Sequence, residues 1–247
     1  MTTYNKTQLT PQKEFEKHIY HRDQFAHYFR WSHILKQAKI GQTVLDMGCG
    51  TGEMLEVFYK NKYKLEHYVG VDIRDRTIKE NISRHINCFE YADFYAKDLC
   101  KPFNLNETFD VITSFEVIEH IGHKNIDAFL ENIIRHCRRD TMIYISTPNY
   151  DPTVGAAANH ILDGEIGEWK HEELEAKLSE RFDIVKKYGT FASIKDYKHL
   201  LNDWQKKMFD TLSEYYDSNL LSCLMAPMFP EQSRNTLWVL RLKNEIN

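Results

Sequence analysis

One short segment of the chain can place backbone groups against a ligand. The segment is VLDMGCGTGEMLEVF, and it contains three of the ten glycines, Gly48, Gly50 and Gly52, between an apolar run and a helical pattern. Glycines here let the backbone lie close to a ligand, and the first turn of the helix offers free N–H groups. The spacing is G-x-G-x-G and an acid, Asp46, precedes it. This pattern favours a zwitterionic ligand with an ammonium group over a dinucleotide diphosphate.

A second acidic residue follows the next predicted strand. The segment YVGVDIR places Asp72 at the end of that strand, 26 residues after Asp46. A carboxylate at this position can accept hydrogen bonds from both hydroxyls of a ribose. The two segments together predict a binding site for a ligand that carries an ammonium group and a ribose.

The glycine segment resembles motif I of the class I S-adenosylmethionine-dependent methyltransferases, and Asp72 matches their ribose-binding acid. The resemblance covers about residues 44–185, and it implies S-adenosyl-L-methionine as the cofactor. It also implies a Rossmann-like, doubly wound α/β fold with a mainly parallel seven-stranded sheet and an antiparallel last strand. A nucleotide-binding or purely structural turn is the alternative. The residues expected to bind the cofactor are Asp46, Gly48, Cys49, Gly50, Asp72, Ile73, Asp98, Leu99, Phe115 and Glu116.

The segment EVIEH directly follows the fourth predicted strand. If a helical turn begins here, Glu116, Glu119 and His120 lie at positions i, i+3 and i+4 on one face. In one interpretation His120 is a general base, and Glu119 holds its tautomer; the unperturbed pKa of imidazole, about 6.5, suits this task. In another, the three side chains bind a divalent cation. In a third, they only shape the cofactor pocket.

The EVIEH segment is similar to motifs of two methyltransferase families. Small-RNA 3′-terminal 2′-O-methyltransferases hold a metal with a matching Glu, Glu and His plus a distant histidine, and ubiquinone-biosynthesis O-methyltransferases carry a related E-x-x-E-H. Where the small-RNA family has its fourth ligand, this chain has Glu165, just before Glu168 and Trp169, and only His160 is near enough to substitute. We therefore expect no metal, and assign His120 and Glu119 as the catalytic pair.

Polar residues follow the fifth predicted strand, in the segment ISTPNYDP. They lie at the same edge of the sheet and face the acceptor, or form a turn without a chemical role. The segment is not the D-P-P-Y of amino-methyltransferases that act on DNA bases, which belongs after the fourth strand. The range 151–168 could close over the acceptor as a lid. Candidate acceptor contacts are Ser146, Thr147, Asn149, Tyr150, Arg234 and Asn235.

Short apolar runs and helical patterns alternate along the chain, which predicts βαβ units and a parallel sheet covered on both faces. The runs are Thr43–Met47, Tyr68–Ile73, Phe109–Ser114, Met142–Ser146, Phe182–Val185 and Leu237–Leu240, and the helical patterns are Glu53–Lys60, Asp75–Ile86, Asn125–Cys137 and Lys170–Glu180. Apolar residues at spacings of three and four predict one long helix over Ser193–Tyr216.

We divide the chain into a helical N-terminal cover (1–40), a cofactor-binding core (41–192), a helical insert near the acceptor (193–235) and the last strand of the core (236–247). The N-terminal helix could cover the cofactor, stack on nucleobases or simply pack on the sheet. Its notable side chains are Tyr20, Arg22, His27, Tyr28, Arg30 and Trp31.

Composition excludes several classes of protein. The chain has 247 residues, of which 42% are hydrophobic and 28% charged, enough for a sizeable core. It has no apolar run long enough to span a membrane and no apolar signal core, so we expect no membrane partner. Five scattered cysteines fit a reducing, cytoplasmic setting without a structural zinc site. The net charge of −4 counts against strong non-specific nucleic-acid binding.

These observations predict an S-adenosylmethionine-dependent methyltransferase that methylates a hydroxyl or amine of a small-molecule acceptor. The reaction is an in-line displacement, in which the protein supplies alignment, exclusion of water and a base. One alternative is nucleic-acid or nucleotide methylation, including metal-assisted 2′-O-methylation. Another is a non-catalytic cofactor-binding protein whose insert contacts a partner. The sequence does not determine the oligomeric state.

Overall fold

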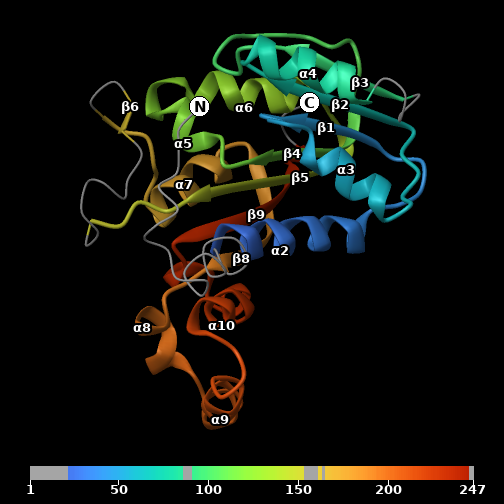
Figure 1. Cartoon of the computed structure of the whole chain (residues 1–247). Helices are drawn as coiled ribbons and strands as arrows, with labels where there is room; N and C mark the ends of the chain where they lie inside the picture. The colour runs from blue at the N-terminus through green and yellow to red at the C-terminus, as the bar shows by residue number, and fades with distance from the viewer. Residues whose placement is uncertain (1–21, 86–90, 153–160, 163–164, 245–247) are drawn as a thin grey trace, which may run out of the picture.

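The computed structural model of the protein describes residues 22–85, 91–152, 161–162 and 165–244. Three features of the sequence analysis lie outside these ranges: Tyr20, His160 and most of the predicted lid. The described chain is built around a single large sheet with helices on both faces (Figure 1).

The sheet has seven strands in the order β3-β2-β1-β4-β5-β9-β8. Strand β9 runs antiparallel to β5 and β8, whereas β1 to β5 pair in parallel. This is the predicted, mainly parallel sheet with an antiparallel last strand. A separate two-stranded ribbon joins β6 (Ile161–Leu162) to β7 (Glu165–Ile166). The strands are β1 (Thr43–Met47), β2 (His67–Asp72), β3 (Ala92–Ala96), β4 (Phe109–Phe115), β5 (Cys137–Pro148), β8 (Phe182–Phe191) and β9 (Asn235–Leu242).

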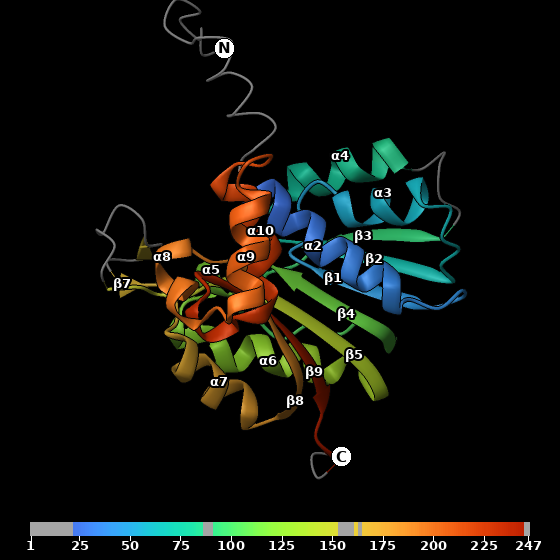
Figure 2. The ribbon, with the colours of Figure 1, turned by 90° about the horizontal axis from the view of Figure 1, so that it is seen from below.

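Two apolar layers hold the helices to the sheet. Helices α2, α3 and α4 pack on one face, and α5, α6 and α7 pack on the other (Figure 2). Every residue of β1 is buried, because both faces of the strand are covered. The helices are α2 (Arg22–Gln37), α3 (Glu53–Lys60), α4 (Asp75–His85), α5 (Ile118–Ile121), α6 (Ile126–Arg135), α7 (His171–Ser179), α8 (Ile194–Tyr197), α9 (Asp203–Leu212) and α10 (Ser218–Met225).

Two elements differ from the sequence prediction. Strand β3 was missed because its segment, ADFYA, buries only Phe94 at the edge of the sheet and carries no apolar run. The single long helix over Ser193–Tyr216 was wrong, since α8 ends at Tyr197 and α9 begins at Asp203. Asn202 starts the new helix: its side chain accepts a hydrogen bond from Gln205 N (2.9 Å), and the Gln205 side chain accepts one from Asn202 N (2.9 Å).

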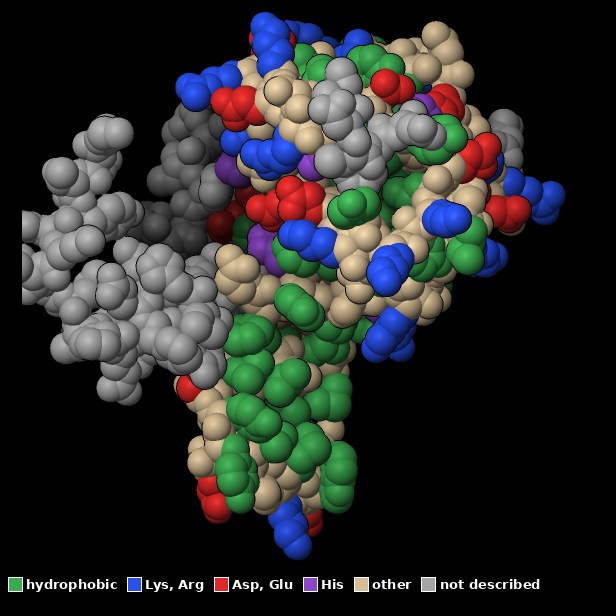
Figure 3. Space-filling model, turned by 45° about the vertical axis from the view of Figure 1, so that its right-hand side comes forward, with side chains coloured by type: hydrophobic (Ala, Val, Ile, Leu, Met, Phe, Trp, Pro, Cys, Tyr) green, Lys and Arg blue, Asp and Glu red, His purple; other side chains and the backbone are tan. Residues whose placement is uncertain are grey.

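Helices α8 to α10 form an arm that extends away from the sheet (Figure 1). The arm has a small core of its own, which includes Tyr197, Phe209 and Leu221. The face of the arm seen in Figure 3 is rich in apolar side chains, and the exposed large apolar residues in and next to the arm include Trp204, Tyr215, Tyr216, Leu224 and Met228. Within the described ranges, no helix combines the length and the apolar character needed to cross a membrane.

Candidate active site

The glycine turn joins β1 to α3 and packs against Val117. Gly48, with φ of 83°, donates its N–H to Val71 O (2.7 Å), and a Cβ built on it would lie 2.3 Å from Val117 Cγ2. Gly52 has φ of 79° and is the N-cap of α3. Both positions therefore require glycine, and the turn holds the N-terminus of α3 beside the carboxyl ends of β2 and β4.

Asp72 ends β2 and faces the glycine turn. Its Oδ2 accepts a hydrogen bond from Gly50 N (3.0 Å), and its Oδ1 accepts from the backbone N (2.9 Å) and Nε (3.1 Å) of Arg74. Burial alone would raise the pKa of Asp72, but the hydrogen bonds and charge of Arg74 and the bond from Gly50 hold it below its ordinary value. The carboxylate is therefore ionised and lines the cofactor cavity, and its contact with ribose hydroxyls stays a prediction.

A cavity of about 410 Å³ lies beyond the carboxyl ends of β1, β2 and β4. Its lining includes His120 and the apolar side chains of Val117 and Ile121. The volume falls within the usual range for a pocket that holds a small organic cofactor. Of the predicted cofactor-binding residues, six line this cavity: Gly48, Asp72, Ile73, Asp98, Leu99 and Glu116.

The other four predicted cofactor-binding residues do not line the cavity. Asp46 is buried in β1, where its carboxylate accepts hydrogen bonds from Tyr68 Oη (2.6 Å) and Thr113 Oγ1 (2.9 Å). Burial raises the pKa of Asp46 to about 6. Asp46 therefore links β1 to its two neighbouring strands, β2 and β4, just before the glycine turn. Its contact with an ammonium group stays a prediction. The remaining three are Cys49, Gly50 and Phe115.

The EVIEH segment does not form the single helical face that the spacing predicts. Glu116 has φ of 56° and Val117 is non-helical, so α5 begins only at Ile118. Glu119 is buried and accepts a hydrogen bond from Thr147 Oγ1 (2.9 Å) on β5, whereas His120 is exposed and lines the cofactor cavity. The positive φ before the helix turns the two glutamates towards different neighbours.

Glu116 lies at the centre of a polar network that connects four elements. Its Oε1 accepts hydrogen bonds from Arg30 Nη1 and Ser146 Oγ (2.8 Å), and its Oε2 accepts from Asn235 Nδ2 (2.8 Å). Arg30 is 1% exposed, and its guanidinium lies over the Phe115 ring at 5.5 Å. Burial alone would raise the pKa of Glu116, but the Arg30 charge and the bonds from Asn235 and Ser146 lower it. Glu116 and Arg30 are therefore an ion pair, in which Arg30 is buried and the Glu116 side chain is 31% exposed.

The protonation state of Glu119 differs from the ionised form that the sequence prediction assumed. Burial, and then the charge of Glu116, raises the pKa of Glu119 to about 8, and the nearby Glu168 adds to the shift. At neutral pH Glu119 is therefore a neutral carboxylic acid. Across the residues that the structure describes, no group of three or more His, Cys, Asp or Glu side chains is arranged to hold a metal ion.

The predicted acceptor-side residues fall into two groups. Ser146, Thr147 and Asn235 belong to the hydrogen-bond networks around Glu116 and Glu119. Asn149, Tyr150 and Arg234 line a second cavity farther along the sheet edge.

In the N-terminal helix, the sequence analysis named Arg30 but missed its pairing with Glu116. The two residues are 86 positions apart, and no local pattern joins them. Of the other residues predicted there, Tyr28 is 74% exposed, and His27 packs against Trp31 with ring centroids 5.2 Å apart.

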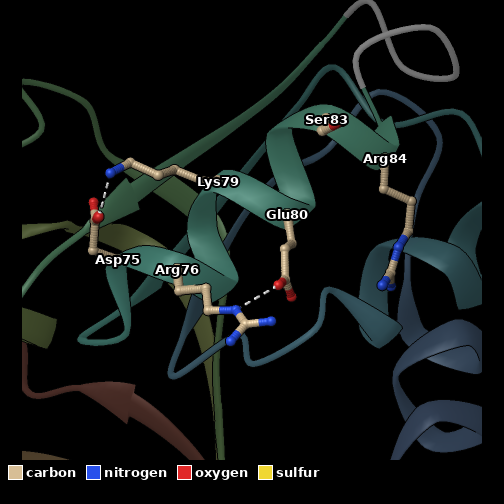
Figure 4. Close-up of a pocket in the computed structure, with 6 residues that line it drawn as sticks. All are labelled: Asp75, Arg76, Lys79, Glu80, Ser83 and Arg84. Atoms are coloured by element: carbon tan, nitrogen blue, oxygen red, sulfur yellow. Dashed lines mark hydrogen bonds and ion pairs between the residues drawn. The ribbon is translucent and has the colours of Figure 1, made fainter.

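A hollow on the outer surface of α4 is larger than the cofactor cavity, but its lining does not suggest a functional site. It measures about 570 Å³, and all of its lining residues lie between Asp75 and Arg84 on this one helix. Two i,i+4 ion pairs span it, Lys79 with Asp75 and Arg76 with Glu80 (Figure 4). The hollow is a solvated helix surface on the far side of α4 from the sheet.

Residues 20–203 of the chain match the family model of the methyltransferase domain. This match covers the glycine turn, Asp72 and the cofactor cavity. The chain belongs to this family. It is an S-adenosyl-L-methionine-dependent methyltransferase.

Two curated relatives have named activities. The ubiquinone biosynthesis O-methyltransferase of Rickettsia akari (strain Hartford) is 28% identical over 204 residues, which is 81% of this chain and 74% of that enzyme. The (S)-tetrahydroprotoberberine N-methyltransferase of Eschscholzia californica is 32% identical over 111 residues, or 44% of this chain. That match spans only 30% of the plant enzyme.

Solved structures agree on the fold. An S-adenosylmethionine-dependent methyltransferase from Clostridium acetobutylicum ATCC 824 superposes with a TM-score of 0.61 at 12% identity, covering 94% of this chain and 98% of that one. The residues of the cofactor cavity also fit this cofactor. The cavity contains ionised acids at Asp72 and Asp98 and apolar side chains such as Leu99 and Val117, the kinds of group that a ribose and an adenine require.

Proposed function

We propose that this methyltransferase methylates a hydroxyl or amine of a small-molecule acceptor. The observation that carries the proposal is that His120 lines the cofactor cavity while remaining exposed. A base in this position can meet an acceptor that enters from solvent next to the bound cofactor. When bound, the cofactor supplies a methyl group made electrophilic by its sulfonium.

The residues of the chain would then divide the work. Asp72 binds the ribose hydroxyls, Asp98 and Leu99 lie beside the adenine, and the glycine turn approaches the methionine portion. His120 removes a proton from the acceptor as the methyl group is transferred. The ion pair of Arg30 and Glu116 closes the wall next to the cavity and helps to exclude water.

The proposed domain division gives the N-terminal segment a part in this site. Of the predicted N-terminal cover, residues 1–40, the part that the structure describes supports this role, because Arg30 of α2 reaches Glu116 at the cavity wall. Residues 41–192 and 236–247 form the cofactor-binding core, and 193–235 is an insert beside the acceptor. Asp196 and Arg234 of the insert line the second cavity farther along the sheet edge, which supports this placement.

The relatives support a small acceptor over a nucleic acid. Both curated relatives described above are named for small-molecule O- or N-methylation, and the net charge of −4 is unfavourable for binding a polyphosphate backbone. We also propose a cytoplasmic location. None of the described cysteines, Cys49, Cys100, Cys137 and Cys223, forms a disulfide, as expected in a reducing compartment.

A transfer assay with methyl-labelled S-adenosylmethionine tests the proposal. The purified protein is incubated with a pool of small metabolites and, separately, with total RNA. We expect label in the metabolite pool. Label only in RNA would contradict the small-molecule acceptor, and cofactor binding without transfer to either pool would support the non-catalytic alternative.

A further inference from the structure

The Asp72 carboxylate makes four hydrogen bonds to its own chain. Its Oδ1 accepts from the backbone N (2.9 Å) and Nε (3.1 Å) of Arg74. Its Oδ2 accepts from Gly50 N (3.0 Å) and Arg74 Nη2 (3.4 Å). Since an ionised carboxylate has about four acceptor sites, these bonds use all of them. Two sites are filled by backbone N–H groups and two by the guanidinium of Arg74.

The two backbone donors are held firmly. Gly50 belongs to the glycine turn, and its carbonyl oxygen accepts a hydrogen bond from Asn81 Nδ2 (2.8 Å), a fully buried side chain of α4. The backbone N of Arg74 lies just before the first residue of α4. Neither donor can leave Asp72 unless the turn or the start of α4 moves.

The guanidinium of Arg74 is held much less firmly. The Arg74 side chain is 62% exposed, whereas that of Asp72 is 8% exposed. An exposed arginine gives up rotamer freedom to keep one contact, and such ion pairs contribute little to stability. Of the four donors, the two on the guanidinium are therefore the ones that a ligand can replace.

The guanidinium also lies where the cofactor must approach. Arg74 and Asp72 both line the cofactor cavity. A Cβ built on Gly50 would lie 3.6 Å from Arg74 Nη2, so the guanidinium reaches over the glycine turn. A carboxylate that is 8% exposed cannot accept two further hydroxyl donors while the guanidinium keeps its place.

We propose that Arg74 competes with the two ribose hydroxyls of the cofactor for Asp72, and thereby sets the affinity for S-adenosylmethionine and for the product, S-adenosylhomocysteine. The inference rests on the proposed contact between Asp72 and the ribose. Two hydroxyl donors replace two guanidinium donors, and the backbone bonds from Gly50 and Arg74 remain. The apparent affinity is then lowered by the fraction of molecules in which the guanidinium holds Asp72. Because the product carries the same ribose, the returning guanidinium also favours product release.

Removing the guanidinium tests the competition. Arg74→Ala should tighten binding of S-adenosylhomocysteine about three- to fivefold, the upper range for an exposed ion pair, because the contact has two prongs. The matched control is Arg76→Ala, which removes the same charge from an arginine that pairs with Glu80 (2.9 Å) on the outer side of α4 (Figure 4). The control should stay within about twofold, because a solvated charge away from the ligand is screened. Calorimetry at low ionic strength and neutral pH measures both variants.

A double variant and added salt show whether Arg74 acts through Asp72. In the Asp72→Asn background the charge that binds the guanidinium is gone, so adding Arg74→Ala should tighten binding by less than about twofold. With Asp72 present, the advantage of Arg74→Ala should shrink in 1 M salt, where the Debye length is about 3 Å. An advantage that persists in the double variant, or that salt does not change, would mean that the side chain merely obstructs the cavity, and would overturn the proposal.

Unchanged binding in Arg74→Ala also overturns the competition, and weaker binding would mean that the guanidinium contacts the cofactor instead. Asp72→Asn alone separates this inference from the proposed function. If Asp72→Asn leaves the affinity unchanged, the ribose contact itself is wrong. If Asp72→Asn weakens binding and Arg74→Ala does not tighten it, only the competition is wrong.

Thermal unfolding identifies a misfolded variant. Arg74→Lys would then replace Arg74→Ala, because lysine keeps the charge but cannot make the two-pronged contact. It should tighten binding in the same direction and by a smaller factor. Since all of these measurements record binding, they decide the inference whether or not a methyl acceptor is found.

Discussion

Two parts of this site are assembled in different ways. We call the part around the glycine turn and Asp72 the cofactor half, and the part around Glu116, which also lines the cofactor cavity and which we propose faces the acceptor, the acceptor half. In the cofactor half, Gly50 and Asp72 are 22 residues apart and lie on consecutive βα units, and Asp46 is tied to Tyr68 over the same separation. In the acceptor half, Glu116 is bound by Arg30 and Asn235, which are 86 and 119 residues away. A compact motif therefore specifies the first half, whereas long-range contacts assemble the second.

The difference extends to charge. In the cofactor half, Asp72 is an ionised acid held by backbone N–H groups and the exposed Arg74. In the acceptor half, the partly exposed Glu116 is kept ionised by its ion pair, and the buried Glu119 is neutral. Since the two glutamates repel each other in a buried environment, only the one with a cationic partner keeps its charge.

His120 lies where the two halves meet, and its removal should have the largest effect. We expect His120→Ala to lower the turnover number by about 10²–10⁴-fold, the usual contribution of a general base, with little change in cofactor affinity. Steady-state kinetics and calorimetry measure the two quantities. His123→Ala is the control, because His123 stacks on Trp169 at 4.0 Å outside the cavity lining. Activity that is lost with a chelator and restored by Mn²⁺ would instead support a metal.

The Arg30–Glu116 pair tests whether long-range contacts hold the acceptor half together. Arg30→Met leaves the partly exposed Glu116 carboxylate without its cation, so the free energy of unfolding should fall by about 1.5–3 kcal/mol, the usual value of a hydrogen bond to a charged group. Adding Glu116→Gln should restore most of the loss, because the unpaired charge is then gone. Urea unfolding at neutral pH measures both variants. A single variant as stable as the unaltered protein would show that the pair does not hold α2 in place.

Asp72 tests the cofactor half separately. Asp72→Asn keeps an oxygen for the N–H of Gly50 but removes the charge offered to the ribose, at a cost of roughly 1.5–3 kcal/mol per charged hydrogen bond. Cofactor affinity should therefore fall at least tenfold by calorimetry. Asp98→Asn, the same change in the same cavity, is the comparison and should cost less. An unchanged affinity in Asp72→Asn would mean that the ribose binds elsewhere.

Glu119 tests the charge difference through pH. Its pKa is about 8 in the folded protein and near the ordinary glutamate value of 4.5 when unfolded. The stability due to the neutral carboxyl is thus complete below about pH 4.5 and is lost as pH rises towards 8, by at most about 1.4 kcal/mol per pH unit. Glu119→Gln should remove this dependence, so that its stability advantage over the unaltered protein grows between pH 5 and 8. Thermal unfolding across this range measures it, and parallel curves would contradict the shift.

Much of the cofactor half was predictable from the sequence. The apolar run before Gly48 can only be a doubly covered strand, and the glycines and Asp72 follow from what a ribose-bearing ligand needs at the carboxyl edge of a parallel sheet. For the EVIEH segment the proposed chemistry stays a prediction, and the predicted geometry was wrong. Its spacing implied one helical face, and the positive φ of Glu116 abolished that face. Such a conformation is imposed by Arg30, Ser146 and Asn235, and no local pattern records it.

The sequence by itself determined the fold class, the family and the edge of the sheet at which the cofactor binds. These follow from contiguous residues, because strand periodicity, a glycine turn and its following helix are local properties. Only the tertiary structure decided which glutamate is charged, that Arg30 pairs with Glu116, and that a second cavity lies at the same edge of the sheet. Burial and long-range pairing set the charge of a side chain, and both depend on residues that meet only when the sheet is complete.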